Sequence, residues 1–259
     1  LDAAVAWYAQ DFGGENAGGS TLPAGGIIPS GGRNAFVHFG KVEVELIEPQ
    51  DKTGLPADTL VMHHVGYAVS DIAASIADLR ARGFKFFSDT PNTNVLGQQV
   101  LYFDPASTNG VLIHLTQLPS QPSVVGLDAG VKIDHIVHAG YLVNNLEDAI
   151  AWYVDKLGGT HLGGGASRRG GRNAFVNFGQ VQVELIEPPD PASLVPAHSM
   201  DHVGYVALDI EATIADCRAR GFQFVADTPN TNAVGQQVLY FETDSSRGSR
   251  MHLTQLPAG

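Results

Sequence analysis

The chain has 259 residues, 44% of them hydrophobic, and carries 15 Lys and Arg against 27 Asp and Glu, for a formal net charge of -12. This length predicts one large domain or two ordinary ones, and the apolar content excludes a disordered chain. The negative charge excludes nucleic acid and anionic membrane surfaces as partners, and no apolar run approaches the ~18 residues of a spanning helix. We therefore expect a globular protein, and its single cysteine, Cys217, fits a cytoplasmic location.

The chain repeats itself at a steady offset. The segment GGRNAFVHFGKVEVELIEP at 31–49 returns at 170–188 with only three of 19 positions changed, and DTPNTN and GQQVLYF each occur twice. This agreement predicts two homologous modules, at residues 1–118 and 132–259. The stretch 119–131 between them contains Pro, Ser and Gly and is predicted to be an exposed linker.

Each module divides into two units with one order of predicted elements. The first unit opens in a helical pattern at Leu1, which aligns with Leu146, so its leading strand would have to precede residue 1. The later units begin with the β-rich runs MHHVGYAV, IVHAGYLV and MDHVGYVAL, and helices follow, as over 146–157 and 209–220. Runs such as NAFVNFG, VQVELIEP, QQVLYF and RMHLTQL close the units. The sequence thus predicts an α+β protein of four βαβββ units.

Histidine and glutamate recur at matching places on the predicted strands. The second module carries His138, Glu184, His202 and His252 on the first and last strands of its units. Taken singly, Glu184 fits a solvated strand residue, His202 a hydrogen-bonded surface residue and His252 a satisfied core residue, since strand side chains alternate between faces. Three imidazoles and a carboxylate held on strands also suit Zn, Ni, Co, Mn or Fe(II), which makes the set a candidate metal site.

The first module repeats three of these residues, as Glu45, His64 and His114. The residue that matches His138 would lie before residue 1. We therefore expect either a further strand from there or a site with only three ligands.

Other polar residues are assigned more modest roles. The remaining histidines are predicted to lie on the surface: His38, His63, His135, His161 and His198. The pairs Arg33-Asn34 and Arg172-Asn173 are either exposed turn residues or binders of a substrate carboxylate. The Asn-rich turns and the pairs Gln98-Gln99 and Gln236-Gln237 are candidates for the mouth of a cavity.

Paired βαβββ units with a ligand-type residue on the first and last strand of each unit resemble the vicinal oxygen chelate superfamily, also called the glyoxalase/bleomycin-resistance/dioxygenase fold. Within it, LEDAIAWYVDKLG, VELIEP, MHHVGYAVSDIAASIADLRARGF and FDPASTNGVLIHLTQ look like segments of methylmalonyl-CoA epimerase-like proteins. The resemblance implies curled mixed sheets around concave sites. The metal ligands that it implies are His138, Glu184, His202 and His252, with Glu45, His64 and His114 in the first module. The last position departs from the family, which has Glu where this chain has His252 and His114.

The family uses a divalent metal ion to stabilise an enolate or oxyanion beside a carbonyl group. The resemblance implies a metal-dependent isomerase or lyase that acts on a small oxygenated carbonyl compound through an enolate-type intermediate. Glu184 and Glu45 would be ligands or bases, and His252 and His114 would ligate the metal or shuttle protons. An Fe(II)-dependent extradiol-type dioxygenase and a metal-free, resistance-type binding protein remain alternatives. A homodimer is compatible with the sequence, because family members pair units within or between chains.

Overall fold

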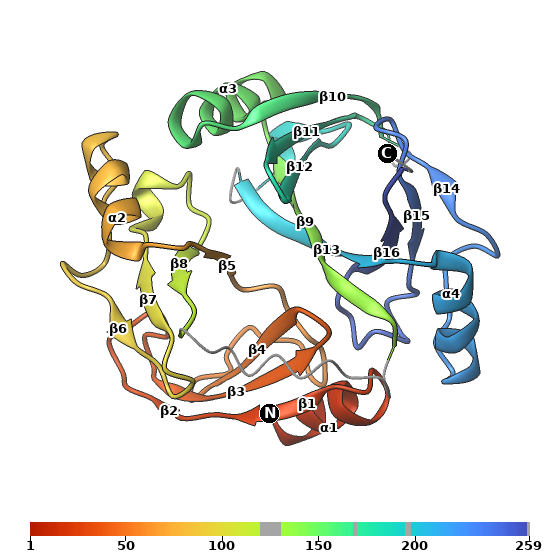
Figure 1. Ribbon diagram of the computed structural model, residues 1–259, viewed down its shortest axis with the longest axis horizontal. Helices are drawn as coiled ribbons and strands as arrows, with labels where there is room; N and C mark the ends of the chain where they lie inside the picture. Colours follow the sequence, from red (N-terminus) through yellow and green to blue (C-terminus); the bar gives the residue numbers. More distant parts are fainter. Residues whose placement is uncertain (120–130, 168–169, 195–197, 258–259) are drawn as a thin grey trace.

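The computed structural model describes residues 1–119, 131–167, 170–194 and 198–257. Most of the predicted linker, 120–130, therefore lies outside the described residues. The helices α1 to α4 lie at the periphery and surround curled sheets (Figure 1). Within the described part of the chain, no helix is long and apolar enough to cross a membrane.

The first module contains two separate sheets. Its first unit comprises α1 (Asp2–Gln10), β1 (Glu15–Gly18), β2 (Thr21–Leu22), β3 (Gly32–Phe39) and β4 (Val42–Pro49). Its second unit comprises β5 (Val65–Ala68), α2 (Ile72–Ala81), β6 (Asn92–Thr93), β7 (Gln99–Tyr102), the 3-10 turn η1 (Pro105–Ser107) and β8 (Ile113–Gln117). In one sheet β3 pairs with β1, β2 and β4, and the other sheet has the order β5-β8-β7-β6. Consequently β4 and β5 each keep one edge that pairs with no strand among the described residues.

The second module contains one continuous sheet of eight strands. Its first unit comprises β9 (Ile133–Val143), α3 (Leu146–Leu157), β10 (Thr160–Ala166), β11 (Arg172–Phe178), β12 (Val181–Glu187) and the 3-10 turn η2 (Pro191–Ser193). Its second unit comprises β13 (His198–Ala207), α4 (Ile210–Ala219), β14 (Asn230–Thr231), β15 (Gln237–Tyr240) and β16 (Met251–Gln255). The order is β10-β11-β12-β9-β13-β16-β15-β14, with β9 parallel to β12 and antiparallel to β13. The two leading strands, β9 and β13, therefore join the half-sheets, and the predicted βαβββ order is confirmed.

The ends of the helices follow from local signals. α3 begins after Asn145, whose side chain accepts a hydrogen bond from the backbone N–H of Asp148, and it ends at Gly158, which has a left-handed φ of 78°. Asp209 caps α4 in the same way by accepting from the backbone N–H of Ala212. Both predicted helices are thus confirmed to within a residue at each end.

The hydrophobic cores are shared between the modules. One core joins the first unit to the fourth, and the ring centroids of Phe12 and Phe222 lie 5.2 Å apart in it. The other joins the second unit to the third, where Phe84 and Trp152 lie 5.9 Å apart. Burial of apolar surface is the main favourable contribution to folding. Each module therefore depends on the other to cover its apolar faces.

One predicted surface histidine is in fact buried. His198 is only 6% exposed, and its ring centroid lies 5.4 Å from that of Tyr141. The sequence pattern places the start of this strand at Met200, but β13 extends back to His198, which pairs with Val143. The surface prediction for His198 is wrong because this pairing turns its side chain toward the core. The other four differ less: His63 and His161 are exposed, and His38 and His135 are half-buried.

Candidate metal centre

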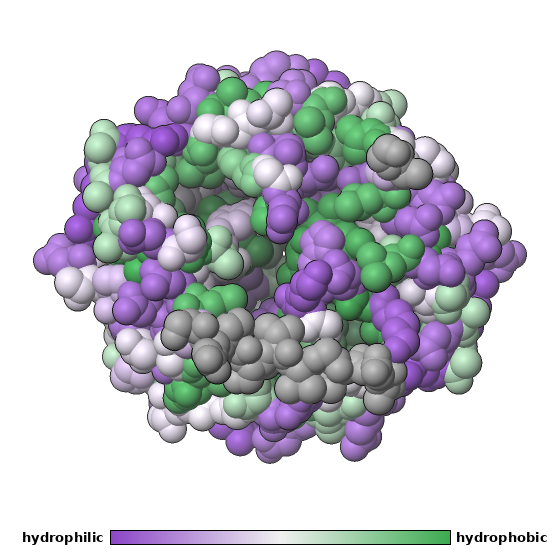
Figure 2. Space-filling view, viewed as in Figure 1, coloured by the Kyte–Doolittle hydropathy of each residue, from purple (hydrophilic) through white to green (hydrophobic). Residues whose placement is uncertain are grey.

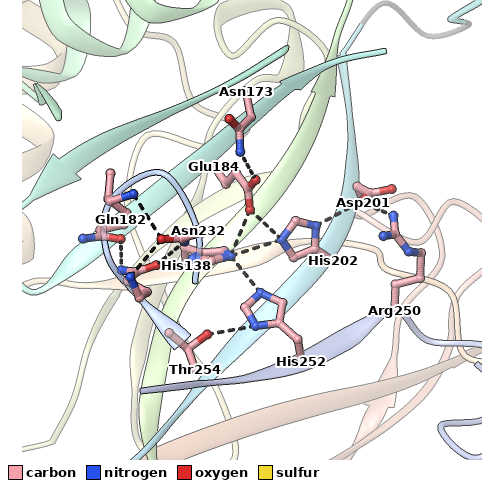
Figure 3. A network of polar contacts seen from close by, with 12 residues as sticks. His138, Asn173, Gln182, Glu184, Asp201, His202, Asn232, Arg250, His252 and Thr254 are labelled. Atoms are coloured by element: carbon pink, nitrogen blue, oxygen red, sulfur yellow. Dashed lines mark hydrogen bonds and ion pairs between the residues drawn. The ribbon is translucent and has the colours of Figure 1, made fainter. Parts of the chain in front are cut away.

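Four strands of the second module bring the predicted ligands together. His138 lies on β9, Glu184 on β12, His202 on β13 and His252 on β16 (Figure 3). These strands are consecutive in the sheet, so inward side chains at similar heights converge. The three histidines are 0–1% exposed, which places the cluster inside the protein.

The ring nitrogens of the cluster meet at short distances. His138 Nε2 lies 3.1 Å from His202 Nε2 and 3.0 Å from His252 Nε2. Glu184 Oε2 lies 3.4 Å from His138 Nε2 and 3.2 Å from His202 Nε2. In the part of the chain that the structure describes, these three histidines are the one group of metal-binding residue types whose ligand atoms all lie within 4.8 Å of one another.

These distances fit a tetrahedral metal ion. With metal–nitrogen bonds of about 2.05 Å, tetrahedral geometry puts two ligand atoms about 3.3 Å apart. The four measured separations, 3.0, 3.1, 3.2 and 3.4 Å, lie on either side of this value. A set of imidazole and carboxylate donors suits zinc and other first-row divalent ions. The residues present therefore fit the kind of ion that the sequence implies.

Glycines on neighbouring strands provide the space that the rings occupy. A Cβ atom on Gly140 would lie 2.0 Å from Cε1 of His202, and one on Gly204 would lie 2.5 Å from Cε1 of His252. Each glycine is the register partner of the histidine whose ring covers it. Sequence reasoning missed these glycines. The signal that could have found them is the motif His-x-Gly-Tyr, which occurs three times in the chain and places a glycine two residues after each histidine.

The ring of His202 is oriented by an acidic partner. Its Nδ1 atom lies 2.9 Å from Oδ2 of Asp201, and Arg250 pairs with the same carboxylate. Because a carboxylate only accepts, we assign the ring proton to Nδ1. In the neutral form of His202, the Nε2 lone pair then points at the centre of the cluster, as a metal ligand requires.

His252 is oriented by neutral partners. Its Nδ1 atom lies 3.3 Å from the carbonyl oxygen of Leu253 and 2.8 Å from Oγ1 of Thr254. Because a carbonyl oxygen only accepts, we assign the ring proton of His252 to Nδ1, and Nε2 is then unprotonated and directed at the cluster. In His138 the Nδ1 atom is buried without a partner in the structure. Two of the three rings are thus held in the orientation for metal ligation by contacts outside the cluster.

Burial and pairing set the charge states in the cluster. Burial lowers the pKa of His138 to about 4, and burial together with the other two histidines lowers that of His252 well below its usual range. Burial also acts to lower the pKa of His202, but hydrogen bonds to Asp201 and Glu184 outweigh it and the pKa is raised. Burial acts to raise the pKa of Glu184, yet the hydrogen bond and charge of His202 lower it to about 2. At neutral pH His138 and His252 are therefore neutral and Glu184 is anionic, whereas His202 has to release its Nε2 proton when it binds a metal ion.

Amides line the cluster on two sides. Asn173 Nδ2 donates to Glu184 Oε1 at 2.8 Å, which leaves Oε2 to face the histidines (Figure 3). Gln236 Nε2 donates to Gln182 Oε1 at 2.9 Å and its Oε1 accepts from Asn232 at 2.9 Å. Gln236 is 2% exposed, so this predicted mouth residue lies deeper than expected.

The arginines of the Arg-Asn pairs do not reach the cluster. Arg172 is about half exposed and pairs with Glu147 on α3 and Glu187 on β12. Arg33 likewise pairs with Asp2 and Glu48. Each arginine therefore connects a helix to its sheet, and the structure favours this role over binding of a substrate carboxylate.

The first module contains three of the four residues in a matching arrangement. His64 Nε2 lies 3.2 Å from Glu45 Oε2, and the ring centroids of His64 and His114 are 5.1 Å apart. Asn34 Nδ2 donates to Glu45 Oε1 at 2.6 Å, as Asn173 does to Glu184. Among the described residues, no strand of the first module takes the place of β9, and none of them is a counterpart of His138.

Two substitutions further distinguish the first module. His63 stands where the second module has Asp201, and its Nδ1 lies 2.9 Å from Nδ1 of His64. Glu43 stands where the second module has Gln182, and it binds His38 at 2.6 Å and Gln98 at 2.9 Å. The first module therefore lacks an acidic partner for His64 at the position of Asp201. It carries an additional carboxylate, that of Glu43, in its concave face.

Comparison with known proteins places the whole architecture. Residues 1–102 and 137–240 match the model of the Glyoxalase/Bleomycin resistance protein/Dioxygenase superfamily, once in each module. The chain belongs to this superfamily, and the two matches fit a tandem duplication of its fold.

Individual relatives match about half of the chain. Mitochondrial methylmalonyl-CoA epimerase of Homo sapiens is 27% identical over 123 residues, which cover 45% of this chain and 67% of that protein. The enzyme of the same name from Mus musculus is 28% identical over 123 residues, covering 45% and 66%. The crystal structure of methylmalonyl-CoA epimerase from Mycobacterium tuberculosis has 21% identity and a TM-score of 0.44, covering 51% of this chain and 93% of that chain.

Proposed function

We propose that the protein is a metal-dependent isomerase that acts on a small oxygenated carbonyl compound at the centre in the second module. His138, His202 and His252 would hold the ion through Nε2, with Glu184 beside them. A divalent ion supplies Lewis-acid stabilisation of the negative charge that develops on a carbonyl oxygen when the adjacent carbon loses a proton. The relatives named methylmalonyl-CoA epimerases make a CoA thioester with an acidic carbon between two carbonyl groups the first substrate to test.

Glu184 is the residue of the cluster best suited to move a proton. The Nδ1 atoms of His202 and His252 already donate, and their Nε2 atoms face the centre, so neither ring has a free lone pair for a substrate proton. Glu184 is anionic at neutral pH, and its side chain is 12% exposed, more than any of the three rings. A pKa of about 2 makes it a weak base. We therefore expect it to accept a proton only from a carbon acid whose developing charge is stabilised beside it.

The observation that carries this proposal is the convergence of three imidazoles and one carboxylate from four consecutive strands. Buried polar groups cost free energy unless they are paired, and here the Nε2 atoms of three buried rings face one another. An ion at that point would pair all three at once. Ligand binding without a metal does not require three buried imidazoles that face one another, so the cluster supports a metal-dependent function.

The test is solvent exchange by the complete chain after loading with Zn, Co, Mn or Fe(II) under anaerobic conditions. With methylmalonyl-CoA in deuterated water, we expect deuterium to enter the carbon between the carbonyl groups. His202→Ala should abolish both the bound metal and the exchange, whereas His161→Ala, an exposed residue of the same module, should change neither.

Two outcomes would overturn the proposal. Metal content well below one ion per chain after loading would remove the metal-dependent reaction. Oxygen consumption by the Fe(II)-loaded protein with a catechol, without deuterium exchange into a carbonyl compound, would replace the isomerase by the extradiol-type dioxygenase.

A further inference from the structure

We propose that Gln182 recognises the substrate of the second module by donating its side-chain N–H groups to an acceptor oxygen, such as that of a carboxylate, beside the metal centre. This inference rests on the proposed function, because it names a substrate contact of that site. Gln182 is the register partner of His138 on β9 and lies two residues before Glu184 on β12. Since strand side chains alternate between faces, its amide lies on the same face as the cluster (Figure 3).

A short relay of amides, from Asn232 through Gln236 to Gln182, determines which end of Gln182 faces the site. Asn232 Oδ1 accepts hydrogen bonds from the backbone N–H groups of Val234 at 3.1 Å and Gln236 at 2.9 Å. Because a backbone N–H only donates, this atom is the oxygen of the amide, and Asn232 Nδ2 therefore donates to Gln236 Oε1. Gln236 is left with Nε2, which donates to Gln182 Oε1. Each amide thus fixes the orientation of the next.

The amide relay leaves one end of Gln182 for a ligand. Its Oε1 atom is occupied by Gln236, and among the described residues its Nε2 atom has no acceptor. Gln236 is 2% exposed and so is held inside the protein, whereas Gln182 is half-buried and open to a small molecule. A fixed pair of N–H groups suits an oxygen that accepts hydrogen bonds, and a carboxylate oxygen forms the stronger bond of this kind.

The first module contains the same relay with a different end group. Asn94 Oδ1 accepts from the backbone N–H groups of Leu96 and Gln98, and Asn94 Nδ2 donates to Gln98 Oε1 at 2.8 Å. Gln98 Nε2 then donates to both carboxylate oxygens of Glu43, at 3.1 and 2.9 Å. A carboxylate only accepts, so the direction of this relay is fixed from both ends. Glu43 offers acceptors to the concave face, and Gln182 in its place offers donors.

Other donors near the cluster are already engaged. Arg172 pairs with two glutamates, on α3 and β12, and Arg250 pairs with Asp201. Figure 2 shows hydrophobic residues beside hydrophilic ones in the region that β10, β13 and β15 enclose in Figure 1. Ligand sites of this mixed kind orient their ligand through a small number of polar groups. Gln182, with a free donor, is suited to be such a group.

The test compares three chelating probes of similar size on the cobalt-loaded complete chain. Propanohydroxamate is neutral, malonomonohydroxamate adds a carboxylate, and β-alanine hydroxamate adds an ammonium group. All three chelate a metal ion through the hydroxamate oxygens, and the visible spectrum of the cobalt ion reports binding. The wild type should bind the carboxylate probe at least about tenfold more tightly than the neutral probe, as expected for a hydrogen bond to a charged group.

Variants of the relay should change this preference without changing metal content. Gln182→Leu should abolish the preference for the carboxylate probe, and Gln182→Glu, which copies the first module, should favour the ammonium probe. Gln236→Met removes the contact that orients Gln182, so the preference should fall about threefold or more while affinity for the neutral probe stays the same. Gln180→Glu is the matched control: it adds a charge at an exposed position two residues away and should keep the wild-type preference.

A second measurement separates this inference from the proposed function. In the isotope-labelled, metal-free chain, malonate should shift the side-chain amide signals of Gln182, which are identified by their loss in Gln182→Leu, and propanediamine should not. If the chain binds no metal, the proposed function fails, and this titration alone decides on Gln182. If it binds metal but exchanges no deuterium, the proposed isomerase fails, and the hydroxamate probes still decide.

Three results would overturn the role of Gln182. One is equal affinity of the wild type for the carboxylate and neutral probes, or tighter binding of the ammonium probe. Another is an unchanged preference in Gln182→Leu. The third, for a chain that binds no metal, is a Gln182 amide signal that does not respond to malonate.

Discussion

Replacement of Gly140 by alanine tests the packing on which the metal centre depends. The new Cβ would lie 2.0 Å from Cε1, 2.3 Å from Nδ1 and 2.5 Å from Nε2 of His202. Ordinary contact begins at 3.4 Å, so relief of the closest clash requires a movement of about 1.4 Å, the difference between 3.4 and 2.0. The φ angle of Gly140 is not in the left-handed region, so the backbone accepts alanine and the effect comes from the ring alone.

The size of the effect follows from the narrow tolerance of metal coordination. Ligand distances hold to about 0.2 Å, so a shift of more than 1 Å removes His202 from the ligand set and from its bond to Asp201. Mutation of the residues that hydrogen-bond to metal ligands reduces metal affinity about 10–100-fold. Loss of a ligand should reduce metal affinity at least about 100-fold, which corresponds to about 2.7 kcal/mol of binding free energy. The clash should also lower the free energy of unfolding of the metal-free protein by about 1–3 kcal/mol.

The assay is competition for Zn or Co with a chelating dye, combined with urea unfolding of the metal-free protein. Gly165→Ala is the matched control, because its Cβ would meet its nearest neighbour, on Ala233, at an ordinary 3.7 Å. This control should leave both quantities unchanged. Metal affinity and stability of Gly140→Ala equal to those of the wild type would refute the idea that the glycine makes room for the ring.

Three other measurements test parts of the structure away from the cluster. Burial lowers the pKa of His198 to about 4, whereas an unfolded imidazole titrates near 6.5, so protons bind the unfolded chain first and remove up to about 3 kcal/mol of stability as the pH falls from 7 to 4. His198→Gln should flatten this part of the pH profile in urea unfolding, and an unchanged profile would contradict the assignment. Arg172→Ala should leave the free energy of unfolding nearly unchanged, because the arginine is half exposed and ion pairs at the surface contribute little, and a clear loss of stability would show that its pairs with Glu147 and Glu187 matter more. Burial raises the pKa of the Cys217 thiol to about 12, so Ellman's reagent should react quickly only after unfolding, and rapid reaction of the native protein would contradict its burial.

Much of the local structure was predictable because its causes lie close together in the chain. The helix from Leu146 to Leu157 ends where Gly158 adopts the left-handed conformation. The helical spacing of its apolar residues and the glycine that ends it both lie within this short segment. His198 shows where this fails. Its neighbours in sequence indicate a loop or a strand end, and only the pairing with Val143, 55 residues earlier, turns it into the core.

The sequence by itself determined the duplication, the order of elements and the histidines and glutamates that lie on the strands. Internal repeats and the alternation of apolar and polar residues can both be recognised from the order of residues alone. Only the tertiary structure decided which strands are neighbours, and therefore that the rings of His138, His202 and His252 meet over Gly140 and Gly204. It also decided that nearly identical strands have different surroundings: β13 is covered by β9, while β5 borders an open space. These features depend on pairing between strands that are far apart in the chain, and a short stretch of sequence does not show which distant strand it will pair with.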